Sequence, residues 1–182
     1  MKKLIHIALA GLLTAVMVTG CGWHLRGSGQ TLNNISSVYV SAPNRQSDFY
    51  RSLIRALKAS KIEITPSATG AQYSIVALNE KSSRRTATVS AGARVSEYQL
   101  TEAIDILILD ADGKQLGSRT TLSAERYFDF DENDVQSKRE ETELLQREMR
   151  NDLVRQVINR LNAISNRTSA PSDTSAEDAP AS

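Results

Sequence analysis

Cys21 is the one cysteine of the 182-residue chain, and the residues before it suit a specific chemistry. It follows Val18-Thr19-Gly20, which is the pattern of a lipobox, with a small residue directly before the cysteine. Small residues fit a signal peptidase pocket, and the thiol is the nucleophile that takes the lipid. Because the cysteine has no disulfide partner in the chain, lipidation would also remove a free thiol from an oxidising compartment. The sequence therefore predicts lipidation at Cys21.

The segment before the cysteine has the composition of a signal peptide, which we assign to residues 1–20. Lys2 and Lys3 form a basic start, and residues 4–18 are almost entirely apolar. A transmembrane helix usually needs about 20 apolar residues, so this run is short for one. The alternative is an ordinary signal peptide that happens to contain a cysteine. Gly22, where an Asp would favour inner-membrane retention, predicts sorting of a lipid-anchored chain to the outer membrane.

Residues for catalysis are scarce in the rest of the chain. His24 is the only histidine after the signal peptide and lies next to the predicted anchor, outside any predicted pocket. One histidine and one lipidated cysteine cannot supply a usual metal site, and no GxxxxGK phosphate loop occurs. Glu97 and Glu102 are five residues apart on a predicted strand, so they point to opposite faces. We expect no enzyme activity, no cofactor and no metal; a lipid-anchored hydrolase is the least favoured alternative.

Basic residues gather at two places that the predicted fold brings near each other. With 22 Lys and Arg against 21 Asp and Glu, the chain as a whole is nearly neutral, so nucleic acid is not an expected partner and an anionic ligand needs a local cluster. Such a cluster could hold phosphates, although ordinary solubility charge is an equally good explanation for any single member. The candidates are Arg84, Arg85 and Arg94, with Lys81, around a predicted hairpin, and Lys138 and Arg139 at the start of the last helix.

Strand and helix periodicities then predict the elements that position these residues. Phe49, Leu53 and Leu57 recur every fourth residue after a possible N-cap at Ser47, which predicts an amphipathic helix. Alternating apolar residues predict half-buried strands, with turns at Ala91-Gly92 and at 110–113. The expected strands cover 36–41, 73–78 with a possible extension over 86–90, 94–109 and about 121–130, and a short extended piece covers 62–64.

The last helix is expected from Ser137 to Ile164, with Ser137 and Glu140 forming a capping box. Together the elements predict an α+β fold, a two-layer sandwich of about four mixed, mostly antiparallel strands with two helices on one face. The other face alternates polar residues and must meet water or a polar protein surface. We divide the mature chain into an anchor and tether over 21–34, a folded domain over 35–165 and a disordered tail over 166–182. The pattern offers no explanation for Glu102.

Four short motifs resemble the LptE family of lipopolysaccharide-assembly lipoproteins, in order from the signal peptide to about Ile164. The most specific is Cys21-Gly22-Trp23-His24-Leu25-Arg26 at the mature start. The others are Glu97-Tyr98-Gln99, Arg126-Tyr127-Phe128-Asp129 and Glu148-Met149 in the last helix. The resemblance implies a helix-covered, mostly antiparallel four-stranded sheet.

The resemblance also implies a function. LptE-like proteins plug the lumen of the β-barrel LptD in a one-to-one complex, help it assemble and bind lipopolysaccharide during its insertion at the cell surface. The family associates ligand contact with a basic residue at the hairpin and a lysine before the last helix. Lys138 matches the second position; Arg94 is the nearest match to the first, with Arg84 and Arg85 as substitutes. The alternative function is an auxiliary lipoprotein adaptor of another envelope lipid transporter.

Overall fold

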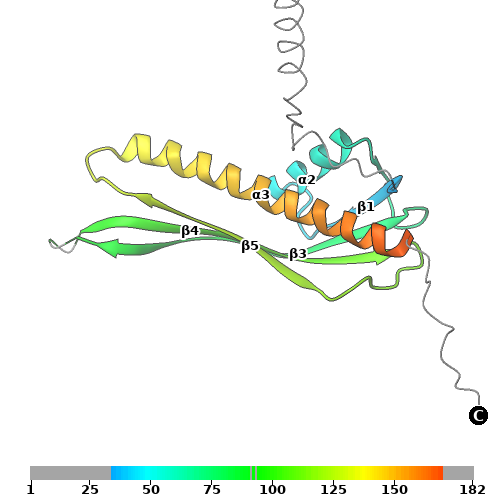
Figure 1. Ribbon diagram of the computed structural model, residues 1–182. Helices are drawn as coiled ribbons and strands as arrows, with labels where there is room; N and C mark the ends of the chain where they lie inside the picture. The colour runs from blue at the N-terminus through cyan, green and yellow to red at the C-terminus, as the bar shows by residue number, and fades with distance from the viewer. Residues whose placement is uncertain (1–33, 91, 93, 170–182) are drawn as a thin grey trace, which may run out of the picture. The chain divides into compact units, whose positions relative to one another are not determined.

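The computed structural model describes residues 34–90, 92 and 94–169, so the predicted signal peptide and Cys21 lie outside the described residues. Two helices cover one face of a five-stranded sheet, whose strand order is β2-β1-β3-β4-β5 (Figure 1). This confirms the predicted α+β sandwich. The elements are β1 (Ser37–Ser41), α2 (Asp48–Ala59), β2 (Glu63–Ile64), β3 (Tyr73–Val89), β4 (Val95–Asp110), β5 (Thr120–Asp129) and α3 (Val135–Ser169).

The strand count is one higher than predicted because residues 63–64 pair as a strand. Ser37 and Val38 of β1 align in parallel with Glu63 and Ile64 of β2. β1 also pairs in parallel with the start of β3, from Tyr73 to Val76. Two residues are too few to show an alternating pattern, so the sequence reveals only an extended piece there. The parallel part follows from the helical connection after β1, as expected.

β3 and β4 form one long antiparallel hairpin, and β5 lies antiparallel on the far side of β4. β1 pairs with β3 only as far as Val76, so the outer half of the described sheet has three strands. The register shifts between Leu78 and Lys81, where Asn79 has a positive φ of 51°. Such a bulge bends the strand and increases its twist. The hairpin thereby carries its far end away from α2 and along α3 (Figure 1).

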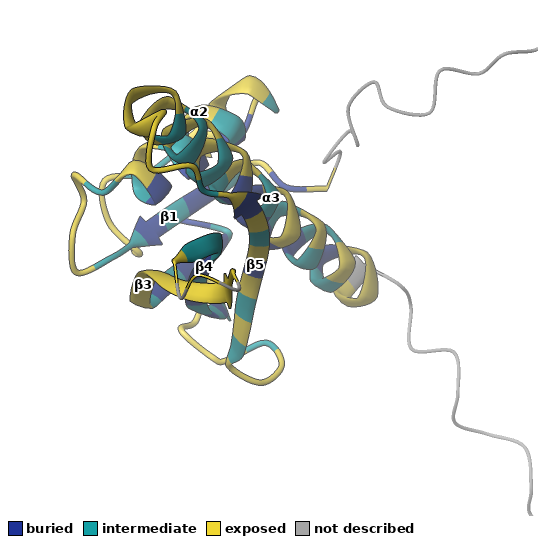
Figure 2. Ribbon diagram, turned by 90° about the vertical axis from the view of Figure 1, so that its left-hand side faces the viewer, coloured by how far each residue is buried: buried dark blue, intermediate teal, exposed yellow. Residues whose placement is uncertain are grey.

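The core lies between the helices and the sheet (Figure 2). The Ser47 side chain accepts a hydrogen bond of 3.1 Å from the backbone N–H of Tyr50, which confirms the predicted helix cap. α2 buries Phe49, Leu53 and Leu57, and the sheet contributes alternate residues of β3 and β4. α3 contributes Met149, Leu153, Val154, Val157 and Leu161.

Both ends of α3 differ from the prediction. The helix begins at Val135, so Ser137 lies inside its first turn and the predicted capping box is wrong. The backbone N–H of Lys138 instead donates to the carbonyl of Asp134, at 3.1 Å. The helix continues to Ser169, so residues 166–169, which we expected in the tail, are helical. Polar composition does not stop a helix whose preceding turns already pack on a core.

Glu102 is buried on the helix-covered face, and the structure supplies the explanation missing from the sequence. It lies opposite Ser82, whose hydroxyl donates a hydrogen bond of 2.8 Å to its carboxylate. Burial raises the pKa of the Glu102 carboxyl above its usual value, while the Ser82 hydrogen bond and the charge of Arg150 oppose this, and the charges of Glu80 and Asp48 add to it. The native state therefore holds the Glu102 proton more tightly than the unfolded chain does.

We expect Glu102→Gln to stabilise the protein at pH 7 and to leave its stability unchanged in acid. The pKa of Glu102 is higher in the folded state than in the unfolded chain. Protonation of Glu102 therefore stabilises the fold below about pH 4.5, and this stabilisation is lost as the pH rises through the pKa of the folded state. Glutamine keeps the acceptor oxygen for Ser82 and cannot ionise. Denaturant unfolding of both proteins between pH 3.5 and 8 measures the difference. Glu63→Gln, at an exposed position, is the control. If the free energy of unfolding of Glu102→Gln differs from that of the wild type by the same amount at every pH, Glu102 does not titrate as described.

Candidate functional site

A hollow of about 340 Å³ lies at the outer end of the sandwich, between the ends of the strands and the start of α3. It has an apolar floor and a charged rim. Three of the predicted basic residues, Arg84, Lys138 and Arg139, come together around it. The other residues that line it are Phe128, Phe130, Val135, Thr142 and Glu143.

Aromatic rings form the floor of the hollow and hold one of its cations. Tyr98 of β4 contacts Phe128, with ring centroids 5.7 Å apart, and meets Phe130 edge-on at 5.1 Å. The Arg84 guanidinium lies 4.8 Å from the centre of the Tyr98 ring, a cation–π contact. Val135, at the start of α3, is 59% exposed beside these rings. The hollow therefore offers uncovered apolar surface next to a positive charge.

The first turns of α3 supply the other two cations. The Lys138 ammonium lies 2.9 Å from the Glu141 carboxylate, and the hydrogen bond between them raises the pKa of Lys138. Its side chain is 21% exposed. Arg139 is paired with Glu143 at 3.4 Å, with both side chains largely in solvent. The Arg139–Glu143 pair is exposed and therefore weak, so an anionic ligand can replace the Glu143 carboxylate.

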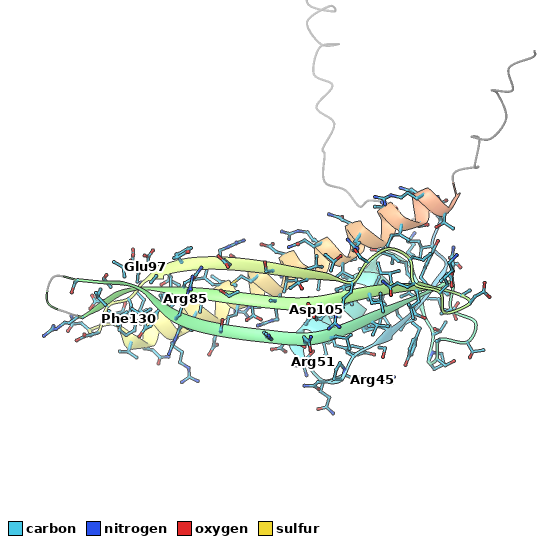
Figure 3. All side chains as sticks on the ribbon, turned by 90° about the horizontal axis from the view of Figure 1, so that it is seen from below. Arg45, Arg51, Arg85, Glu97, Asp105 and Phe130 are labelled. Atoms are coloured by element: carbon cyan, nitrogen blue, oxygen red, sulfur yellow. The ribbon has the colours of Figure 1, made fainter. Side chains whose placement is uncertain are left out.

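Arg85 and Arg94 lie elsewhere. Adjacent residues of a strand point to opposite faces, so Arg85 projects from the face away from the helices, where its side chain donates to Gln99 (Figure 3). Arg94 lies at the hairpin end, loosely paired with Glu132 at 3.8 Å, and it does not line the hollow. Of the three arginines predicted around the hairpin, Arg84 is the one that lines the hollow.

The face away from the helices carries a network of polar side chains, although Gln99 within it is almost fully buried. The Gln99 amide donates to Glu125 at 2.9 Å and to Tyr127 at 2.8 Å. Further along, Asp105 accepts hydrogen bonds from Thr121, Asn79 and Arg119, which together lower the pKa of its carboxyl. Figure 3 shows Arg85, Glu97 and Asp105 along this face. No described helix covers it.

Comparison with known proteins agrees with these features. The protein family described as LptE, lipopolysaccharide-assembly, matches residues 35–161. The chain belongs to the LptE family. It is 25% identical over 167 residues to the LPS-assembly lipoprotein LptE of Photorhabdus laumondii, covering 91% of this chain and 90% of that protein. The Pectobacterium atrosepticum protein of the same name is 24% identical over 156 residues, covering 85% and 82%.

The family fold is also visible in solved structures. A solution NMR structure described as uncharacterized lipoprotein B from Nitrosomonas europaea superposes with a TM-score of 0.67 at 23% identity, covering 80% of this chain and 93% of that one. Within residues 34–169, apart from 91 and 93, no helix is long and apolar enough to span a membrane. In the same described part, no group of three or more His, Cys, Asp or Glu is placed to hold a metal ion.

The motifs that resemble the LptE family divide between the two faces of the sheet. Tyr98 packs on Phe128 and Phe130, which line the hollow, whereas its neighbour Gln99 is buried in the polar network. Phe128 lies in the hollow, and Arg126 pairs with Asp152 of α3 at 2.6 Å, which explains a charged residue in an apolar register. The sequence pattern predicted half-buried strands here but did not assign these aromatic residues to a site. Their alternation with Gln99 and Tyr127 was the signal that could have placed them beside Arg84.

Proposed function

We propose that this protein is an outer-membrane lipoprotein that occupies the lumen of an LptD β-barrel, helps it assemble and binds lipopolysaccharide at the hollow. One observation carries the ligand proposal: a hollow with an aromatic floor is ringed by Arg84, Lys138 and Arg139. The family supports the pathway, since related proteins are named for lipopolysaccharide assembly.

The chemistry of the hollow suits an anionic amphiphile. Lipopolysaccharide carries phosphates close to its acyl chains. The rings of Phe128 and Phe130 give apolar surface for a chain, and the cations at the rim give charge-assisted hydrogen bonds to phosphate. Lys138, the less exposed of the two cations on α3, lies beside Glu141 when no ligand is bound, whereas the exposed pair of Arg139 with Glu143 can open to a ligand. The protein acts in this proposal by binding, and no catalytic step is assigned to it.

The polar sheet face supports the barrel proposal. A β-barrel lumen is lined by polar side chains, because lipid-facing and lumen-facing residues alternate along each strand. The network around Gln99 and Asp105 gives a fixed, polar surface that such a lumen can contact without burying unpaired groups. An anchor at Cys21 would hold the domain on the periplasmic side of the outer membrane while it enters the lumen.

Lipopolysaccharide binding by the purified full-length chain in neutral detergent tests the site. We expect Arg84→Gln with Lys138→Gln to weaken binding more than tenfold, since each lost charge-assisted contact costs about 1.5–3 kcal/mol. The matched control, Lys81→Gln with Lys114→Gln, removes the same charge at exposed positions outside the hollow and should bind as the wild type. Binding that falls equally in both double variants, or in neither, would remove the hollow from the ligand site.

A further inference from the structure

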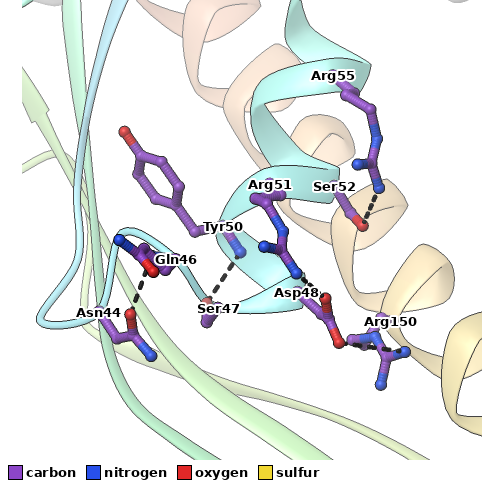
Figure 4. A network of polar contacts seen from close by, with 9 residues as sticks. All are labelled: Asn44, Gln46, Ser47, Asp48, Tyr50, Arg51, Ser52, Arg55 and Arg150. Carbon is purple, nitrogen blue, oxygen red and sulfur yellow. Dashed lines mark hydrogen bonds and ion pairs between the residues drawn. The ribbon is translucent and has the colours of Figure 1, made fainter.

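A second groove lies between α2 and α3, and the proposed function does not use it. Its volume is about 380 Å³, within the range of small-ligand sites. It is lined by Asp48, Ser52 and Arg55 of α2 and by Glu143, Arg147 and Arg150 of α3. Figure 4 shows the α2 side of this groove with Arg150 reaching toward it. Glu143 also borders the hollow, so the two sites are neighbours along α3.

Each of the two acids of the groove has an arginine partner at the margin of the groove. Asp48 accepts a hydrogen bond of 2.5 Å from Arg51, which holds the pKa of its carboxyl low and keeps it ionised. Glu143 pairs with Arg139 at 3.4 Å. Arg55, Arg147 and Arg150 outnumber these two carboxylates, so the lining of the groove carries a net positive charge.

The three remaining guanidinium groups have spare donors. Arg150 is only 18% exposed, yet within the described part of the chain its ion pair is a loose contact of 3.8 Å with Asp48 (Figure 4). Arg55 donates to the Ser52 hydroxyl at 2.9 Å, and Arg147 has no hydrogen bond or ion pair to any residue of the described segments. A guanidinium carries five N–H donors. Arg55 and Arg147 are exposed, so their free donors face water and are open to a ligand, whereas donors left unmatched on the partly buried Arg150 are costly. An incoming anion would satisfy the donors of Arg150 and could recruit the two exposed arginines beside it.

We propose that this groove is a binding site for a phosphate-bearing group, held by Arg147 and Arg150 with Arg55 and the Ser52 hydroxyl. A tetrahedral phosphate accepts hydrogen bonds on several sides, which matches donors that line the groove from two helices. The charge of Arg150 also lowers the pKa of the buried Glu102, which gives it a structural role as well. Arg147 has no such role among the described residues and is therefore the better position to test. The proposal does not depend on ligand binding at the hollow.

The test is an NMR titration of the full-length chain in neutral detergent micelles, observing the Nε–Hε signals of 15N-labelled arginines. Inorganic pyrophosphate is the probe. We expect the Arg147 and Arg150 signals to shift with a saturable curve. Arg147→Gln should weaken the binding reported by Arg150 about tenfold, the loss of one charge-assisted contact. Lys138→Gln is the control for the hollow and should leave the Arg150 curve unchanged.

Two further arms identify the source of the phosphate. In one arm lipopolysaccharide replaces pyrophosphate, and in the other the micelles are doped with short-chain phosphatidylglycerol. A saturable shift of the Arg150 Nε–Hε signal in either arm supports the proposal and identifies the phosphate-bearing molecule. The proposal is overturned if pyrophosphate leaves Arg147 and Arg150 unmoved, shifts them without saturation, or binds the Arg147→Gln variant as tightly as the wild type. Loss of lipopolysaccharide binding at the hollow with an unchanged Arg150 titration would separate the two sites.

Discussion

Leu153→Ala is expected to lower the free energy of unfolding by about 2–5 kcal/mol. Leu153 lies on α3 within the core, 2% exposed, where α3 packs on the sheet. Truncation removes buried apolar surface and leaves a cavity that close-packed neighbours cannot fully fill. Because a domain of this size is stable by only about 5–15 kcal/mol, the loss is a large fraction of the total. Urea unfolding followed by circular dichroism measures it.

Leu144→Ala is the matched control for this substitution. Leu144 lies on the same helix but is 49% exposed, so the change in helix propensity is the same while little burial is lost. We expect its effect to stay within about 0.5 kcal/mol. If both variants lose the same free energy of unfolding, the buried face of α3 does not stabilise its packing on the sheet.

Cys21→Ala is expected to abolish lipid attachment and remove the chain from the outer-membrane fraction. The thiol is the only atom of the lipobox that can take the lipid, and several acyl chains are needed for stable anchoring. Metabolic labelling with palmitate, followed by separation of inner and outer membranes, gives both readouts. Ser28→Ala leaves the lipobox intact and serves as the control. Palmitate incorporation that survives in Cys21→Ala would contradict the assignment of Cys21.

Local signals predicted the parts of the fold that local chemistry determines. Ser47 caps α2 because its hydroxyl serves a nearby backbone N–H, and the alternation along β4 marks its buried face. The start of α3 was missed by two residues: Ser137 and Glu140 fit a capping box, but the turn at 131–134 lets the helix begin at Val135. β2 depends on pairing with β1, which a window of sequence does not contain.

The candidate site was predictable in its residue types more than in its arrangement. Arg84 and Arg85 looked interchangeable as neighbours in sequence, yet strand geometry sends one to the hollow and the other to Gln99. To predict that Glu102 is buried, one would need to know that Ser82 lies opposite it after a register shift in β3. The groove between α2 and α3 unites arginines about 100 residues apart, a contact that only tertiary packing creates.

Purification of the tagged full-length chain from outer membranes in mild detergent tests the central claim most directly. The account predicts that a large β-barrel protein, identified by mass spectrometry as LptD, elutes with the chain in a one-to-one ratio. The Cys21→Ala variant, analysed from the same number of cells, should recover less of the complex. Elution of the wild-type chain from the outer membrane without any large β-barrel partner would contradict the account.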